Sequence, residues 1–125
     1  MKNPRVVRIK RNKQGIIQGC DLYIGRAINY GGWNLPQSKW HNPFTVKKYG
    51  NAGLACWLYL EYIIKSDLFH DLPELAGLTL GCWCDYQCKK FGFYCHGAVL
   101  LELFKLVKYY NFDTKMVQSV LRKNI

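Results

Sequence analysis

Four of the six cysteines of this chain crowd into one short segment, and a histidine follows the last of them directly. They are Cys82, Cys84, Cys88 and Cys95, with His96 beside Cys95. Thiolate and imidazole groups bind zinc, and they also act as nucleophiles, acids and bases in catalysis. Any chemistry that the chain performs is therefore expected in a Cys/His site between residues 82 and 97.

Zinc binding is the first interpretation of this segment. Cys82, Cys84, Cys95 and His96 would form a tetrahedral set of ligands, with Cys88 as the substitute for one of them. The spacing argues against it. Cys82 and Cys84 lie two apart on an expected strand, whereas zinc sites usually present cysteine pairs from a turn.

A reactive or anion-binding site is the second interpretation. Cys95 and His96 stand where the next helix should begin, so the positive end of its dipole would activate the Cys95 thiol and hold a phosphate. His96 would then serve as a catalytic acid or base beside Cys95. In the third interpretation Cys82 and Cys84 only fill the core, and Cys88 and His96 have no special role. The sequence leaves all three open.

The elements that position these residues are predicted by periodicity and capping residues. A buried strand is expected at Leu78–Cys84, and apolar residues at helical spacing predict an amphipathic helix from about His96 to Tyr110. A last short helix, capped by Asp113 or Thr114, completes the C-terminal helices over residues 96–123. Asn51 is expected to cap a largely buried helix that ends near Lys65.

The N-terminal half is expected to be extended and irregular. The basic region 1–15 should contain a first strand at Val6–Ile9 and a turn at Asn12–Gly15. A second strand is expected at Ile16–Ile17 or at Asp21–Ile24. Residues 27–43 form a long loop rich in aromatic side chains, and a loop of that length inside a compact domain is usually functional.

A formal net charge of +10 indicates which kinds of partner this chain attracts. Six cations precede the first acid, Asp21, and further cations follow in the C-terminal third. Such a field attracts nucleotides, nucleic acids and acidic protein surfaces. No apolar run is long enough to span a membrane or to serve as a signal peptide, so we expect an intracellular protein with reduced thiols and no membrane partner.

The order of strands, loop, helices, strand and helix predicts the fold class. We expect one small α/β domain over residues 1–125, in which a short mixed or parallel sheet is flanked by helices. A chain of 125 residues can bury one core but not two.

Five motifs spread over most of the chain resemble an uncharacterised family. They are Val6-Val7, Leu22–Arg26, Ser38–Phe44, Leu72–Gly77, and Leu80–Cys84 with Cys95-His96-Gly97. In this order they are similar to the family called domain of unknown function 4326, which occurs in phages, bacteria and large DNA viruses. Two positions depart from the family pattern, because His41 replaces a glycine and Ala98 replaces an acid after Gly97. The loop between Cys84 and Cys95 is also longer than is usual in the family.

The resemblance implies an α/β domain whose site lies near the motif residues. We expect the ligand-binding residues to be Arg26, Lys39, Trp40, Asn42 and Gly97. Arg26 and Lys39 would hold anionic oxygens, Trp40 or Trp33 would stack on a base, and Asn42 would read the edge of that base. We further expect Arg26 and the Lys39–Asn42 loop to face one cavity with Cys95 and His96.

Two functions follow from these expectations. The first is a small basic domain that binds a nucleotide or nucleic acid at the Cys/His site, with the question of catalysis on that ligand left open. The alternative is a structural or interaction module, such as a component of a viral assembly, whose cysteines bind zinc or pack the core.

Overall fold

The computed structural model describes residues 1–83 and 95–125. Their strands and helices follow in the order β1 (Arg5–Arg8), β2 (Lys10–Asn12), β3 (Gly15–Gln18), β4 (Leu22–Tyr23), α1 (Val46–Tyr49), α2 (Ala52–Lys65), a 3-10 helix η1 (Asp67–Leu75), β5 (Thr79–Cys82), α3 (His96–Tyr109) and α4 (Thr114–Lys123). The predicted α/β class is confirmed. None of the helices in the described ranges is long and apolar enough to cross a membrane.

The central sheet has three strands in the order β1-β5-β4, and both pairings are parallel. β2 and β3 form a separate antiparallel hairpin, whose turn falls at the predicted Asn12–Gly15 position. Both expected locations of the second strand are therefore occupied, by β3 and by β4. The expected Leu78–Cys84 strand is β5, which is shorter within the described residues and ends at Cys82.

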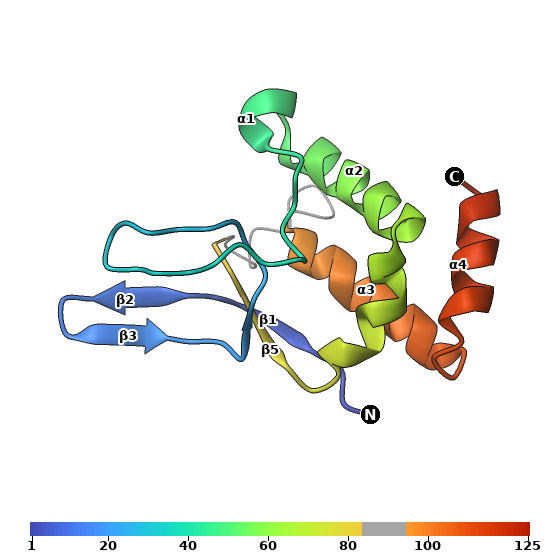
Figure 1. Cartoon of the computed structure of the whole chain (residues 1–125), viewed down its shortest axis with the longest axis horizontal. Helices are drawn as coiled ribbons and strands as arrows, with labels where there is room; N and C mark the ends of the chain where they lie inside the picture. The colour runs from blue at the N-terminus through green and yellow to red at the C-terminus, as the bar shows by residue number, and fades with distance from the viewer. Residues whose placement is uncertain (84–94) are drawn as a thin grey trace.

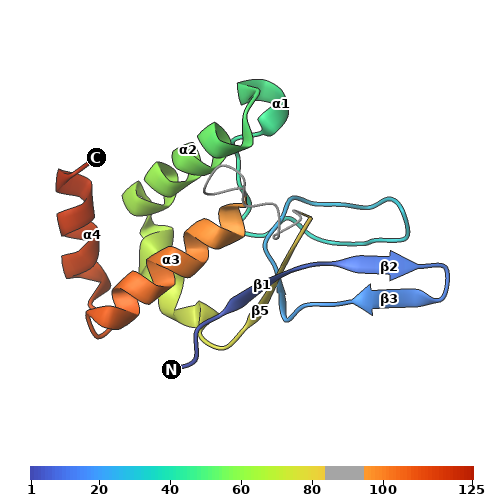
Figure 2. The ribbon, with the colours of Figure 1, turned by 180° about the vertical axis from the view of Figure 1, so that it is seen from behind.

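The helices gather at one end of the molecule, and the hairpin projects from the other end (Figure 1). The view from behind shows the same arrangement, with the chain after β4 running out beside the hairpin and returning toward α1 (Figure 2). One hydrophobic core joins the sheet to α2, η1, α3 and α4. The hairpin contributes no residue to that core.

Capping side chains set the ends of the helices, as the sequence predicts. The Asn51 side chain accepts a hydrogen bond from the Leu54 N–H at the start of α2, and Asp113 accepts one from Met116 at the start of α4. The 3-10 helix η1 begins at Asp67, because the hydroxyl of Ser66 caps it by accepting from the Leu68 N–H. Pro73 consequently lies inside that 3-10 helix.

Candidate functional site

A cleft of about 680 Å³ opens where the end of β5, the start of α3 and the loops after β4 meet. Its lining includes four of the residues singled out in the sequence: Arg26, Asn42, Cys82 and His96. Tyr23, Tyr30, Phe44 and Trp83 add aromatic surfaces, and Lys47 adds a second full positive charge. Among the described residues the lining contains no aspartate or glutamate.

Arg26 connects the two loops that border this cleft. Its Nη2 donates a hydrogen bond of 2.6 Å to the backbone oxygen of Asn42. The Asn42 side chain in turn accepts from the Phe44 N–H at 2.9 Å and donates to the Ala55 oxygen at 3.3 Å. Both ends of the amide are thus engaged by the backbone, so Asn42 holds its loop against α2 rather than presenting a free edge to a base.

Tyr23 and Trp83 form the wall next to Arg26. The Trp83 indole N–H donates to the Tyr23 hydroxyl at 2.7 Å, and that hydroxyl donates to the Arg26 oxygen at 2.6 Å. Burial raises the pKa of Tyr23 above its ordinary value, and this outweighs the opposite effects of Trp83 and Arg26. The tyrosine therefore stays protonated as the donor that fixes the backbone at Arg26.

Gly25 is the neighbour that makes room for this wall. A Cβ at residue 25 would lie 2.6 Å from Cζ of the Tyr23 ring. A side chain larger than hydrogen would therefore displace the ring and break its contact with Trp83.

His96 reaches the cleft from the first residue of α3. Its Nε2 lies 2.7 Å from the Ile24 oxygen, and because a carbonyl only accepts, Nε2 carries the proton. The ring packs edge-on against Tyr59, with centroids 5.1 Å apart. Burial raises the pKa of Tyr59 well above its ordinary value, and the nearby Tyr62, Cys95 and Cys56 raise it further. The Tyr59 hydroxyl consequently remains a donor, and it binds the Trp40 oxygen at 2.7 Å.

Cys95 does not line the cleft. Its side chain is 1% exposed, caps α3 by accepting from the Gly97 N–H at 3.3 Å, and lies 3.2 Å from the sulfur of Cys82. The expected open position for a catalytic thiol is therefore wrong, because the cap turns this sulfur toward the core.

Three expected ligand-binding residues also lie away from the cleft. Trp40 is 1% exposed and belongs to the core, so it has no face on which a base could stack. Lys39 pairs on the surface with Asp71 at 3.1 Å and Glu74 at 3.0 Å. Burial lowers the pKa of Lys39, but its hydrogen bonds to the two carboxylates outweigh this and the pKa is raised. Gly97 is buried against β1 and the end of β4 rather than exposed at a ligand.

The zinc hypothesis concerns residues that are only partly described. Among the described side chains, no three Cys, His, Asp or Glu residues form a group that could hold a metal ion. Cys84 and Cys88 lie outside the described residues, so the full proposed set of Cys82, Cys84, Cys95 and His96 is not tested.

A bound structural zinc would have measurable consequences. Protein purified from zinc-replete cells should then carry about one zinc per chain by elemental analysis, and chelation should lower its Tm. Folded protein without zinc from the same preparation would contradict the hypothesis.

The comparisons with known proteins fit the motifs that surround the cleft. A family model described as Domain of unknown function (DUF4326) matches residues 7–106. The chain belongs to this family. It is also 59% identical over 125 residues to the Uncharacterized protein R718 of Acanthamoeba polyphaga mimivirus, with 98% of this chain and 96% of that protein covered. No solved structure matches the chain.

The DUF4326 match contains the whole cleft. It runs from β1 through most of α3, and every described residue of the lining falls within it. α4 lies beyond the match. The cleft is therefore a feature of the DUF4326 part of the chain.

Reasoning from sequence missed several residues of the cleft. Tyr23 and Gly25 lie within one motif, but the role of Tyr23 as a wall also depends on Trp83, which comes from a different segment. The residues around Lys47 and Cys56 do not indicate that these two side chains belong to a site. They enter the lining because α1 and α2 fold over the loop.

Proposed function

We propose that this DUF4326 domain binds a phosphate-bearing small molecule of nucleotide size in the cleft. The observation that carries the proposal is the composition of the lining, where the two fully charged side chains among the described residues, Arg26 and Lys47, are cations that lie with aromatic rings. A volume of about 680 Å³ lies within the range of small-molecule sites.

The arrangement assigns a role to each kind of side chain. Arg26 offers a planar guanidinium, which pairs with phosphate oxygens through two parallel hydrogen bonds, and Lys47 adds a point charge. Tyr30 and Trp83 are exposed and offer flat faces on which a base could stack. Binding needs no covalent step, and catalysis by His96 stays a prediction.

Replacing Arg26 with alanine tests the proposal. Titration of the protein with ATP, AMP and the other common ribonucleotides should show binding, and Arg26→Ala should weaken it by about tenfold to a hundredfold, because hydrogen bonds to charged groups are strong. Stability should fall by no more than about 1 kcal/mol, since one exposed hydrogen bond to Asn42 is lost.

Arg5→Ala is the matched control. The Arg5 guanidinium also makes one exposed hydrogen bond, to the Thr79 hydroxyl at 3.0 Å, but it does not line the cleft. Its removal should leave nucleotide affinity unchanged. If none of the nucleotides bound, or if both variants weakened nucleotide binding equally, the proposal would be overturned and a structural or interaction module would be favoured.

A further inference from the structure

The hairpin and the loop beside it form a projecting arm, which we define as residues 10–18 and 28–35. Both strands of the hairpin and the loop run out together from the body of the molecule (Figures 1 and 2). The Arg11 guanidinium donates to the Gly32 oxygen and stacks over the Trp33 ring, 5.7 Å from its centroid. An isolated bridge between Ile28 and Leu35 closes the loop. These contacts join the two halves of the arm.

The arm carries cations and no acids. Its charged residues are Lys10, Arg11 and Lys13, and the one acid between residues 1 and 60 is Asp21, at the base. The Asp21 carboxylate accepts from the Thr79 N–H at 2.8 Å and so is held at the sheet. A ligand that lies along the arm therefore meets positive charge alone.

Aromatic side chains continue from the arm into the cleft. Trp33 packs edge-on against Trp83 with centroids 5.3 Å apart, and Trp83 packs against Tyr23 at 6.2 Å. Trp83 and Tyr23 line the cleft, as do Ile28 and Tyr30 of the arm itself. Tyr30 is 71% exposed. Ring contacts thus join the arm and the cleft into one surface that carries both cations and aromatic rings.

We propose that this surface binds single-stranded nucleic acid, with one nucleotide in the cleft and the adjoining strand along the arm. The inference rests on the proposed function for its cleft end and extends it from a nucleotide to a polynucleotide. Single strands bind to grooves that combine backbone-neutralising cations with aromatic platforms for the bases. An acidic protein surface would bind to the cations of the arm, but it would give no role to the exposed ring of Tyr30.

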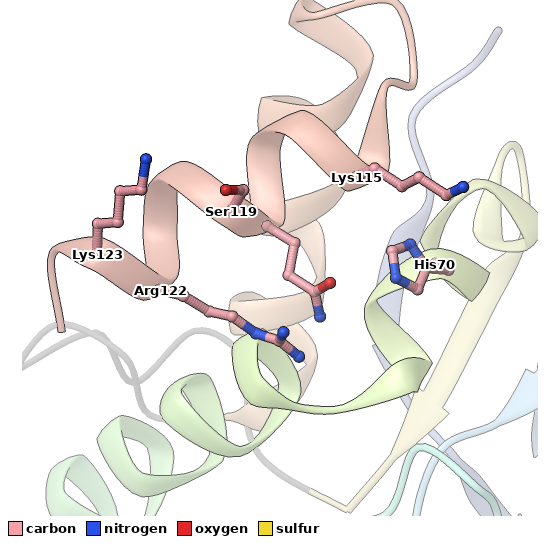
Figure 3. A pocket seen from close by; sticks show the side chains of 6 residues that line it. His70, Lys115, Ser119, Arg122 and Lys123 are labelled. Atoms are coloured by element: carbon pink, nitrogen blue, oxygen red, sulfur yellow. The ribbon is translucent and has the colours of Figure 1, made fainter.

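A second cationic surface serves as the comparison. It is a groove between α4 and η1, lined by His70, Lys115, Gln118, Ser119, Arg122 and Lys123 (Figure 3). Its lining has no Tyr, Trp or Phe among the described residues. Figure 3 shows Arg122 directed toward the end of α2, where it donates to the oxygens of Ile64 and Lys65. This arginine caps a helix, so the groove offers fewer cations than its composition suggests.

The test measures binding of labelled twelve-nucleotide oligo(dT) and oligo(U), a length within the site sizes of about 4–16 nucleotides known for single-strand binders. Lys10→Gln/Lys13→Gln should weaken oligonucleotide binding about tenfold and make the salt dependence of log K shallower by about 1.4, or about 0.7 for each lost phosphate contact. Lys115→Gln/Lys123→Gln removes the same charge from α4 and should change affinity less than about twofold. Oligo(dU), which differs from oligo(U) only in the 2′-hydroxyl, distinguishes DNA from RNA.

Two further measurements separate the possible failures. Tyr30→Ala should weaken oligonucleotide binding about tenfold, because one stacking contact is lost, without changing binding of heparin. Equal losses of oligonucleotide affinity for the arm and α4 variants, or no effect of Tyr30→Ala, would overturn the arm proposal. The proposed function would still stand in that case if AMP or ATP bound in a way that depends on Arg26. Arm-dependent oligonucleotide binding with no nucleotide binding would reject the cleft instead.

Discussion

Replacing Trp40 with alanine is expected to lower the free energy of unfolding by about 3–5 kcal/mol, the range found for truncation of large buried aromatic side chains. Trp40 is 1% exposed and belongs to the same core cluster as Tyr59 and Leu100. Its removal leaves a cavity that neighbours from several elements line and cannot readily fill. The loss should appear in urea unfolding followed by circular dichroism.

Trp57 provides the control for this substitution. It is 53% exposed on α2, so Trp57→Ala should change stability by no more than about 0.5 kcal/mol. A Trp40→Ala protein as stable as Trp57→Ala would contradict the structural role. If such a protein also lost nucleotide binding, Trp40 would be the stacking residue that its motif first suggested.

The helices and strands were largely predictable because their signals are local. The period of the apolar residues in α3 and the capping side chains of Asn51 and Asp113 act within a few residues of the backbone that they order. Pairing of β1 with β5 joins residues more than seventy positions apart, as in Arg5 with Thr79. Sequence order suggested a small sheet, but it did not specify this register.

The candidate site was only partly predictable because its residues lie in loops without a fixed period. Lys39, Trp40 and Asn42 are close in sequence, but they point to η1, to the core and to α2 respectively. In a strand or helix the spacing would have shown which of them share a face. In this loop, the Trp40 N–H donates to the Ser38 hydroxyl, and the Tyr59 hydroxyl donates to the Trp40 oxygen. The bond from Tyr59 comes from another element, so it does not follow from the motif itself.

Cys95 is a second case in which the sequence predicts the position of a residue but not the direction of its side chain. The sequence placed it correctly at the start of α3, where a thiol near free N–H groups could be reactive. In the structure that thiol accepts from Gly97 N–H and faces Cys82, which is equally buried. The Cys95 thiol is thus used to cap the helix, and of the three residues Cys95, His96 and Gly97 it is His96 that lines the cleft.

Replacing Gly97 with alanine is expected to destabilise the fold by about 1–3 kcal/mol, as overpacking of a filled core does. A Cβ at residue 97 would lie 2.9 Å and 3.0 Å from the two methyl carbons of Val6 and 3.2 Å from Cδ1 of Ile24. The absence of a side chain therefore lets the first turn of α3 pack directly on β1 and on the end of β4. Glycine-to-alanine changes inside helices are usually stabilising, so a loss would identify close packing as the reason for glycine.

A second substitution separates packing from every other role of Gly97. Val6→Ala removes both methyl groups that the new Cβ would meet, so the double variant should be less destabilised than the sum of the single variants by about 1 kcal/mol or more. Gly19→Ala is the matched control, since the nearest atom to its Cβ is Cγ2 of Ile16 at 3.7 Å, an ordinary contact. It should be neutral or stabilising by up to about 1 kcal/mol. Strict additivity of Val6→Ala and Gly97→Ala in urea unfolding would show that the Gly97 backbone is needed for something other than its approach to β1.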